Sequence, residues 1–228
     1  MKNTINKKDF YFIPGFHGVQ ETLRRKKVRV KELWIMEGKK SVRTEKILCL
    51  ARELNIPVRL KKGSELADIL PGITHQGIIA LAEKFHYADL DNLLRISLQK
   101  QDQGILIAAD HITDEGNLGS LIRTAAFFGA HGLLIPKDRS AGISTNVLKR
   151  SSGAHAHLPI TRVVNMSRTL NILKKKGFWI IGAAGEGSES IYRFDWKRDL
   201  VLVLGNEQRG LSRAVRELCH EVVKIPSW

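Results

Sequence analysis

Cysteine and long apolar runs are both scarce in this sequence, and each shortage excludes a class of protein. Only Cys49 and Cys219 occur among the 228 residues. Because they match no zinc-ligand spacing, we expect two free, buried thiols in a reducing compartment. No run approaches the roughly 20 apolar residues of a membrane-spanning helix, and the first residues do not resemble a secretion signal. We therefore expect a cytoplasmic protein that does not enter a membrane.

Glycine-rich nucleotide-binding motifs are also missing. No G-x-G-x-x-G follows the first strand of the second half, and the sequence GEGSES after FWIIGAA fails that spacing. No GK[ST] of a phosphate-binding loop occurs anywhere. These absences argue against a nucleotide-dependent dehydrogenase.

Acidic residues are too few to balance the basic ones. The chain has 37 Lys and Arg against 23 Asp and Glu, which gives a net charge of +14. Residues 1–62 alone carry a net +11, and the block RRKKVRVK, Arg24 to Lys31, is the densest part. So uneven a basic block indicates a polyanionic partner, most often nucleic acid. The alternative is a solvated basic face that only aids solubility.

The first part of the chain has the pattern of a small α/β unit. One helical pattern places Ile47, Leu50, Ala51 and Leu54 on one face. A polar helix at 86–103 follows as a joint. The other expected helices are 15–25 and 63–70, and the expected strands are 30–36, 56–61 and 77–83.

From Gly104 onward, short apolar strands alternate with helices. This pattern is typical of a parallel sheet with helices on both faces, in which ligands bind at the carboxyl ends of the strands. The expected strands are 105–110, 132–136, 157–163, 178–185, 200–207 and 221–226, and the helices are 117–129, 145–151, 167–176 and 211–219.

The loop TDEGNLGSLIRTA follows the first of these strands. Its helix buries a stripe that begins at Leu118, so Arg123 lies off the stripe and is free to face a ligand. Asn117 can cap the helix, and a capped helix with a surface Arg is the alternative interpretation.

Two further loops contain unusual residues. In LVLVLGNEQRGLSRAV a buried strand runs into Glu207, and a buried carboxylate is costly unless it is paired or used. A salt bridge from Glu207 to Arg123 would be a sufficient structural reason for both. In RSSGAHAHLP the small residues would let a nucleotide or cofactor lie against the backbone. Its His155 and His157 have no third ligand candidate beside them, so no metal is expected.

The motifs DEGNLGSLIRTA and LGNEQRGLS, with SSGAHAHLPITRVVN between them, resemble the SpoU/TrmH family of RNA ribose 2′-O-methyltransferases within the SPOUT superfamily. The stretches IPGFHGVQETL and HQGIIAL resemble the RNA-binding domain of the subgroup that methylates a guanosine of 23S ribosomal RNA. The resemblance implies an α/β-knot catalytic domain at 104–228, with a parallel sheet and helices on both faces. It implies a small α/β RNA-binding domain at 10–84, similar to the ribosomal L30e-like fold, and a linker helix at 85–103.

The resemblance also implies the chemistry and its residues. S-adenosyl-L-methionine is the expected cofactor, RNA the expected partner, and a homodimer through the catalytic domain the expected assembly. A transfer RNA would be methylated by the same chemistry. The implied catalytic residues are Asn117, Arg123 and Glu207; the implied cofactor-binding residues are Gly205, Ile225, Leu204 and Gly185; and the expected RNA-binding residues are Arg24, Arg25, Lys26, Lys27 and Arg29.

The sequence departs from the family pattern in two places. Glu115 stands where relatives usually have Pro, and we expect the loop to tolerate this loss. Relatives continue after IP with a third motif, roughly SLNVSxA, whereas here only Ser227 and Trp228 follow. This difference predicts an incomplete knot and cofactor pocket. It keeps a catalytically impaired or non-catalytic RNA-binding paralogue as the alternative.

Overall fold

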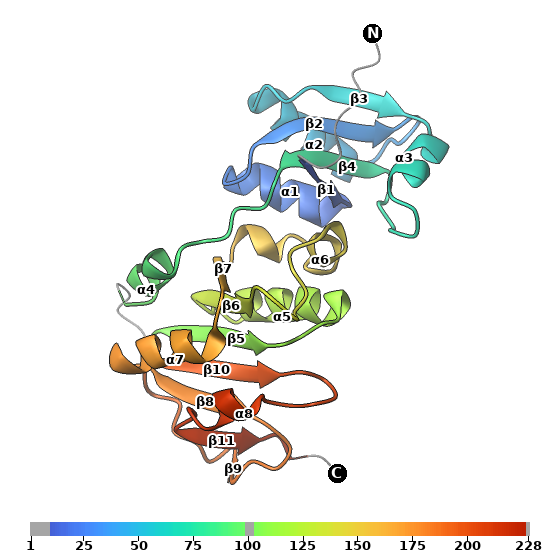
Figure 1. Cartoon of the computed structure of the whole chain (residues 1–228). Helices are drawn as coiled ribbons and strands as arrows, with labels where there is room; N and C mark the ends of the chain where they lie inside the picture. The colour runs from blue at the N-terminus through green and yellow to red at the C-terminus, as the bar shows by residue number, and fades with distance from the viewer. Residues whose placement is uncertain (1–9, 99–102, 227–228) are drawn as a thin grey trace. The chain divides into compact units, whose positions relative to one another are not determined.

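The computed structural model describes residues 10–98 and 103–226, which divide into two compact units (Figure 1). Unit 1 comprises the residues up to His86 together with Ile143–His157. Unit 2 comprises Tyr87–Gly142 and the residues from Leu158 onward. The segment Ile143–His157 was expected in the continuous catalytic domain that starts at 104, so its place in unit 1 is a difference from the sequence-based limits.

Unit 1 is built on a four-stranded mixed sheet. Its strand order is β1-β4-β2-β3, in which β4 is antiparallel to both of its neighbours and β3 is parallel to β2. Strand β1 was not predicted. Its apolar run is short and ends in Pro14, which is typical of an edge strand. The elements are β1 (Phe10–Pro14), β2 (Val30–Met36), β3 (Val58–Lys61) and β4 (Ile78–Glu83), with helices α1 (Phe16–Arg25), α2 (Val42–Glu53) and α3 (Gly63–Ile69).

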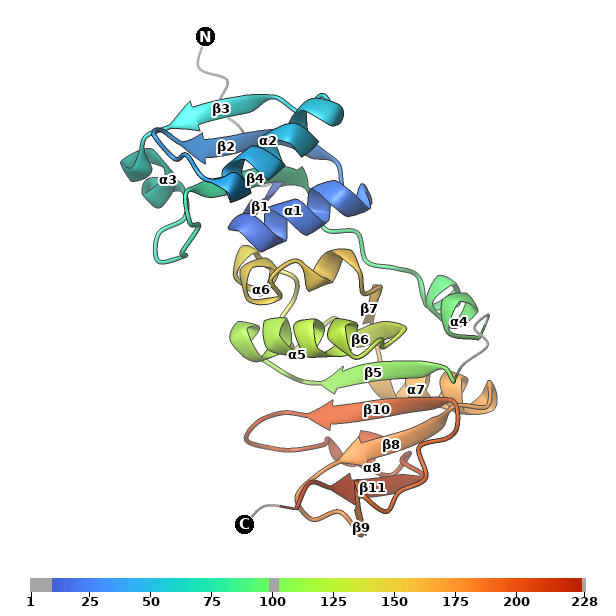
Figure 2. The ribbon, with the colours of Figure 1, turned by 180° about the vertical axis from the view of Figure 1, so that it is seen from behind.

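The helices of unit 1 cover its sheet because strand side chains alternate between the two faces. Trp34 of β2 packs with Leu66 of α3, whereas α1 and α2 contact each other. Figure 2 shows α2 in front of the sheet. Helix α6 (Thr145–Arg150) packs on β1, and the short 3₁₀ helix η1 (Ala154–Ala156) packs on α1.

Unit 2 contains a seven-stranded sheet in which every neighbouring pair is parallel. Its order is β7-β6-β5-β10-β8-β11-β9. This confirms the parallel sheet expected from the alternating pattern. The strands are β5 (Ile105–Asp110), β6 (Gly132–Pro136), β7 (Ile160–Val163), β8 (Trp179–Ala183), β9 (Glu189–Ser190), β10 (Leu200–Gly205) and β11 (Glu221–Lys224).

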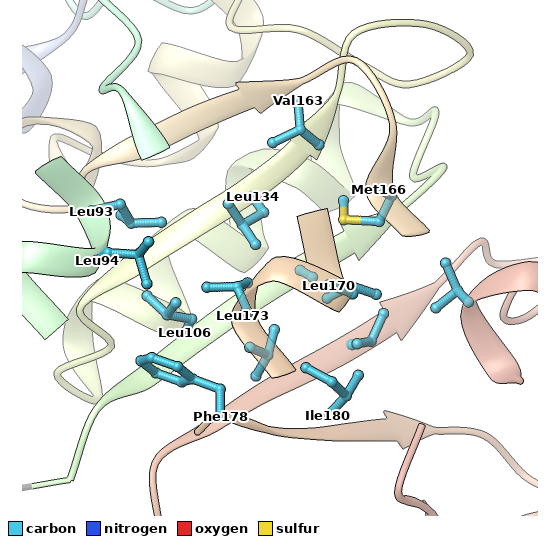
Figure 3. Packing of buried hydrophobic residues seen from close by; sticks show 14 residues of the cluster. Leu93, Leu94, Leu106, Leu134, Val163, Met166, Leu170, Leu173, Phe178 and Ile180 are labelled. Carbon is cyan, nitrogen blue, oxygen red and sulfur yellow. The ribbon is translucent and has the colours of Figure 1, made fainter. Parts of the chain in front are cut away.

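The core of unit 2 lies between this sheet and helices α4 (Leu90–Leu98), α7 (Met166–Lys175) and α8 (Arg213–Arg216). Figure 3 shows Leu170, Leu173 and Phe178 closely packed in this core. Helix α4 was expected as a polar linker, yet it buries Leu93 and Leu94 here. Helix α5 (Glu115–Phe127) buries Leu118 and Ile122. Among the described residues, no helix is long and apolar enough to cross a membrane.

Candidate active site

The loop that precedes Asn117 and the loop that contains Glu207 leave the sheet of unit 2 side by side. Strands β5 and β10 are parallel neighbours, and Asp110, the last residue of β5, is paired with Gly205, the last residue of β10. Both loops therefore begin at the same edge of the sheet. This is the carboxyl edge, where parallel sheets bind ligands.

Asp110 ties the two loops together. Its side chain is fully buried. Its Oδ2 accepts a hydrogen bond of 2.7 Å from the backbone N–H of Ser212, and its Oδ1 lies 2.7 Å from His111 Nδ1. Sequence reasoning missed this residue. The charged end of the apolar strand ILIAAD was the available signal, because a buried carboxylate needs partners.

Asn117 belongs to the first turn of α5, which begins at Glu115. The predicted cap was wrong: Asp114 is the N-cap residue, and its carboxylate accepts from the Asn117 backbone N–H at 2.7 Å. The Asn117 side chain is therefore available for another contact. Its Nδ2 donates to Glu207 Oε1 at 2.8 Å, across 90 residues of sequence.

The loop after β10 is tightly closed. Asn206 and Gly210 exchange two backbone hydrogen bonds of 2.9 Å, and a Cβ on Gly205 would overlap the backbone of Gly210. Asn206 Nδ2 donates to the His111 carbonyl at 2.9 Å and to Glu207 Oε2 at 3.2 Å. Glycine at 205 thus permits the turn, and Asn206 links it to the first loop.

Arg123 does not join this cluster. It is exposed on α5, and among the residues that the structure describes it forms no ion pair with Glu207. Six residues separate it from Asn117, which corresponds to about 9 Å along the helix axis and a different face. A Glu207–Arg123 salt bridge therefore does not explain these two residues, and Glu207 instead accepts hydrogen bonds from Asn117 and Asn206.

A cavity of about 420 Å³ opens beside these loops. Two arginines reach it from different loops, Arg139 and Arg209. Guanidinium groups in such a cavity suit a phosphate, which accepts charge-assisted hydrogen bonds from them. The complete lining is His111, Thr113, Arg139, Asn206, Gln208, Arg209, Gly210 and Ser212.

The expected cofactor residues come from three adjacent strands. In the order β10-β8-β11, Leu204 is paired with Ala183, and Ala183 is paired with Val223. Leu204 and Gly205 end β10, and Gly185 and Ile225 follow β8 and β11 within two residues. All four thus lie at the carboxyl edge of the sheet.

This edge combines exposed apolar surface with open backbone. Ile225 is 67% exposed, and a Cβ on Gly185 would meet no atom within 4 Å. The loop behind it is held by hydrogen bonds from Ala184 N–H to the Val223 carbonyl (3.0 Å) and from Ser188 N–H to the Val222 carbonyl (3.0 Å). Exposed apolar side chains and open backbone suit a largely apolar ligand with a few polar groups.

The basic block of unit 1 lies at the end of α1 and in the turn after it. Arg24 pairs with Glu21 (3.4 Å), and Arg29 pairs with Glu83 (3.8 Å). Arg25 Nε donates to His157 Nδ1 at 2.9 Å. Lys26, Lys27 and Arg29 also line a cavity of about 880 Å³. The block is exposed as expected, but its arginines already have partners.

The two histidines of the loop RSSGAHAHLP have structural partners. His155 is 4% exposed, and burial lowers the pKa of its imidazole to about 4. Its Nδ1 lies 2.9 Å from Ser151 Oγ and its Nε2 lies 3.4 Å from Thr22 Oγ1. His157 Nε2 lies 2.8 Å from Glu21 Oε2. In the described part of the chain, no three His, Cys, Asp or Glu side chains are placed to hold a metal.

The two cysteines are both free, but only one approaches the expected burial. Cys49 is exposed on α2, so the prediction of two buried thiols was wrong. Cys219 is half-buried. Burial, with a smaller contribution from the negative charge of Asp110, raises the pKa of its thiol to about 11. Neither cysteine is part of the loop cluster.

Two family models match this chain and together cover most of it. Residues 104–228 match the SpoU rRNA Methylase family. Residues 12–88 match a domain described as RNA 2′-O ribose methyltransferase substrate binding. The cluster of Asp110, Asn117, Asn206 and Glu207 lies in the first of these regions, and so do the expected cofactor residues. The basic block lies in the second.

Relatives over nearly the whole length support the same grouping. The chain is 35% identical over 212 residues to the 23S rRNA (guanosine-2′-O-)-methyltransferase RlmB of Pseudomonas aeruginosa, covering 93% of this chain and 85% of that protein. It is 34% identical over 217 residues to RlmB of Escherichia coli, covering 94% and 88%. The fold is similar to that of the SpoU methyltransferase AviRb from Streptomyces viridochromogenes, with a TM-score of 0.80, 23% identity, and coverage of 100% of this chain and 84% of that one.

Proposed function

We propose that the substrate of this chain is a guanosine of 23S ribosomal RNA. The chain belongs to the SpoU rRNA methylase family and is an S-adenosylmethionine-dependent RNA 2′-O-ribose methyltransferase. Two relatives that are named 23S rRNA (guanosine-2′-O-)-methyltransferases are 34–35% identical to this chain over at least 93% of its length. The first unit, which matches the substrate-binding domain, supports a large folded RNA as the substrate. The proposal concerns which base carries the methylated ribose and which RNA contains it.

The observation that carries the proposed site is the hydrogen bond between Asn117 and Glu207. It joins the two loops that contain the family motifs, although 90 residues separate them. Both side chains are exposed to a ligand, beside a cavity with two arginines. We assign the catalytic centre to this cluster.

Methyl transfer to a ribose requires an activated and aligned hydroxyl. The 2′-hydroxyl is a poor nucleophile near neutral pH, so it must lose its proton as it meets the electrophilic carbon. Bound S-adenosylmethionine would supply that methyl carbon and leave as S-adenosylhomocysteine, and the Glu207 carboxylate would accept the proton of the hydroxyl. Asn117 and Glu207 then position the sugar with an amide and a carboxylate. A guanidinium seldom gives up a proton, so Arg123 is better suited to grip the neighbouring phosphate and stabilise the forming alkoxide.

The cofactor assignment rests on the carboxyl edge of β10, β8 and β11. We propose that Gly205 and Gly185 contact the cofactor through their backbone, and that Leu204 and Ile225 provide apolar contacts. The exposure of Ile225 and the open space at Gly185 support this role. A crystal structure of AviRb contains AdoMet and matches this chain with a TM-score of 0.77 at 24% identity, covering 100% of this chain and 85% of that one.

We also propose that unit 1 binds RNA through the basic block and that the protein is a homodimer through unit 2. The block contributes the exposed cations Arg24, Arg25, Lys26, Lys27 and Arg29. For the dimer, the supporting observation is an exposed aromatic pair at the end of α5. Phe127 and Phe128 are 84% and 76% exposed, and their ring centroids are 5.3 Å apart.

The decisive experiment is methyl transfer from labelled S-adenosylmethionine to in vitro transcribed 23S ribosomal RNA. Nuclease digestion and mass spectrometry should identify a single 2′-O-methylguanosine. Labelled 2′-O-methyl groups on another nucleotide, or only on transfer RNA, would overturn the proposed substrate and leave the enzyme class intact. Calorimetric titration with S-adenosylhomocysteine tests the cofactor edge separately.

A non-catalytic RNA-binding role is the second candidate, and one observation favours it. Arg123 lies apart from the Asn117–Glu207 pair, so the three expected catalytic side chains are not assembled in this structure. This role predicts RNA binding with no affinity for S-adenosylhomocysteine. Micromolar binding of S-adenosylhomocysteine would contradict it.

A further inference from the structure

We infer a second RNA-contacting surface on unit 1, distinct from the basic block. It consists of Lys39, Lys40, Arg43 and Lys149, and we call it the Lys39 shelf. The inference rests on the proposed function in taking RNA as the ligand. The side chains that we assign to phosphate contacts lie outside the dense basic block at 24–31.

The shelf borders two hollows that share a wall. Each has a volume of about 530 Å³, and Met36, Lys39 and Gln76 line both. One hollow continues along the loop 72–77, with Leu70 and Ile73 in its lining. The other continues along the start of α2, where Lys40 and Arg43 line it. A lining that combines cations with apolar side chains suits a nucleotide, because its phosphate is charged and its base is largely apolar.

The loop between the hollows is held in one conformation. The Phe16 backbone N–H donates to Gln76 Oε1 at 3.3 Å, and the Met36 N–H donates to the Gly77 carbonyl at 2.8 Å. His75 Nδ1 accepts from the Gly77 N–H at 3.1 Å. Gln76 has a φ of 54°, which a side-chain-bearing residue rarely adopts, and such conformations cluster at ligand sites. The hollows are thus preformed.

In the part of the chain that the structure describes, no acidic side chain pairs with the cations of the shelf. None of the nine ion pairs among the described residues includes Lys39, Lys40, Arg43 or Lys149. Arg43 lies over the Phe16 ring, 5.5 Å from its centroid, which orients the guanidinium without neutralising it.

Lys149 is close enough to the loop to belong to the same electrostatic environment. Its Nζ would lie 2.8 Å from a Cβ on Gly15. Burial and then Arg150 lower its pKa, and burial, Lys149 and Lys39 lower the pKa of His75. These shifts agree with a cluster of cations that lacks an anion. A phosphate would supply one.

The basic block provides the contrast. Arg24, Arg25 and Arg29 already bind Glu21, His157 and Glu83. An RNA that uses these arginines must compete with their partners, whereas no acidic side chain among the residues at 10–98 and 103–226 pairs with the shelf. Unpaired RNA nucleotides are the form that enters such hollows, because proteins recognise splayed bases by packing them against side chains.

The test compares two triple variants of the full chain. The shelf variant is Lys39→Gln/Lys40→Gln/Arg43→Gln. The matched control, Arg52→Gln/Lys175→Gln/Lys176→Gln, removes the same number of charges at exposed positions outside the shelf. Affinity for in vitro transcribed 23S ribosomal RNA is measured by filter binding between 50 and 300 mM KCl, roughly the range over which counterion release is resolved.

The shelf variant should bind the RNA on the order of ten- to one hundred-fold more weakly than wild type. Its plot of log affinity against log salt should be shallower by about two, because each lost contact removes about 0.7 from the slope for single strands. The control should stay within threefold of wild type, roughly the effect of non-specific charge loss. Equal affinities and slopes for wild type and shelf variant would overturn the inference, and so would equal losses in both variants.

This result is separable from the proposed substrate. If wild type transfers no methyl group to 23S ribosomal RNA, the enzyme proposal fails, but a selective binding loss in the shelf variant still supports the shelf. Thermal unfolding of both variants shows whether they are folded. If the triple variant unfolds, the single variant Lys40→Gln decides, with an expected loss of about threefold and a slope change near 0.7.

Discussion

The two units keep their polar side chains in different places. In unit 1 the cations lie around loops and helix ends, and those of the Lys39 shelf form no ion pair with any residue that the structure describes. In unit 2 the polar groups converge at the carboxyl ends of β5 and β10, where Asp110, Asn117 and Glu207 bond to other parts of the loops. Because of this difference, we expect that RNA affinity and the rate of methyl transfer can be altered separately. Changes in unit 1 should affect RNA affinity, and changes in unit 2 should affect the rate.

The largest expected effect is on the rate of methyl transfer in unit 2. Arg123→Ala and Glu207→Ala should each lower kcat by about 10²–10³, the usual loss when one preorganised polar group is removed from a reacting centre. Affinity for RNA should remain within about threefold, because Arg123 contributes one phosphate contact among many and Glu207 contributes none.

Two exposed residues of unit 2 serve as matched controls for this experiment. Arg168 lies on α7, and Glu217 pairs with Arg213 at 2.9 Å. Their alanine variants should keep wild-type kcat in single-turnover assays. If Arg123→Ala and Glu207→Ala also retained it, the assigned centre would be wrong.

Acidification should weaken unit 1 through one residue. His155 has its pKa lowered to about 4 by burial, whereas an unfolded histidine titrates near 6.5. The unfolded state therefore binds the proton first, so this contribution is complete above pH 6.5 and is lost as the pH falls toward 4. The loss is about 3 kcal/mol in order of magnitude.

Urea unfolding at pH 7.0 and pH 4.5, followed in wild type and in His155→Gln, measures this contribution. The variant retains hydrogen-bonding groups near Ser151 and Thr22 but cannot gain the charge. It should show a smaller decrease in unfolding free energy between the two pH values. Identical decreases in both proteins would count against the assignment.

A smaller effect is expected for the buried carboxylate of unit 2. Asp110→Ala leaves the Ser212 N–H without its acceptor, and an unsatisfied buried donor costs about 1–3 kcal/mol. For a chain of this size each kcal/mol lowers Tm by roughly 2–4 °C. Calorimetry measures this shift, with Asp138→Ala in an exposed loop as the control. An unchanged Tm for Asp110→Ala would show that the loop is held by its other contacts.

The smallest expected effect is on the basic block. Lys26→Gln/Lys27→Gln should lower RNA affinity about tenfold and leave kcat at saturating RNA unchanged, because two phosphate contacts are lost and no reacting group is touched. A filter-binding titration and a turnover assay at excess RNA separate the two quantities. A fall in kcat at saturating RNA would break the proposed separation between the units.

Much of the fold was predictable because it depends on local patterns. The apolar strands 105–110 and 132–136 agree with β5 and β6, since a doubly buried strand needs a continuous apolar run. The last helix was expected at 211–219 but α8 spans only Arg213–Arg216. Helix α5 begins at Glu115, two residues before its predicted start, because Asp114 rather than Asn117 caps it.

The candidate site was predictable in its residue types and less so in its contacts. Asn117 and Glu207 were expected together, and they bond directly. Glu207 bonds to Asn117 and Asn206 rather than to Arg123, and the contribution of Asp110 was missed. The Lys39 shelf was overlooked because the block at 24–31 is denser in cations than the stretch at 39–43, and because Lys149 is distant from that stretch in the sequence.

The sequence by itself determined the parallel sheet, the two motif loops and the uneven charge, because these follow from periodicity, spacing and composition. Only the tertiary structure decided which side chains meet. The register of β5 against β10 brings Asn117 to Glu207, and the burial of one α5 stripe fixes the direction of Arg123. The packing of α6 on unit 1 brings Lys149 to the shelf. Such contacts depend on packing between distant segments, which no local pattern records.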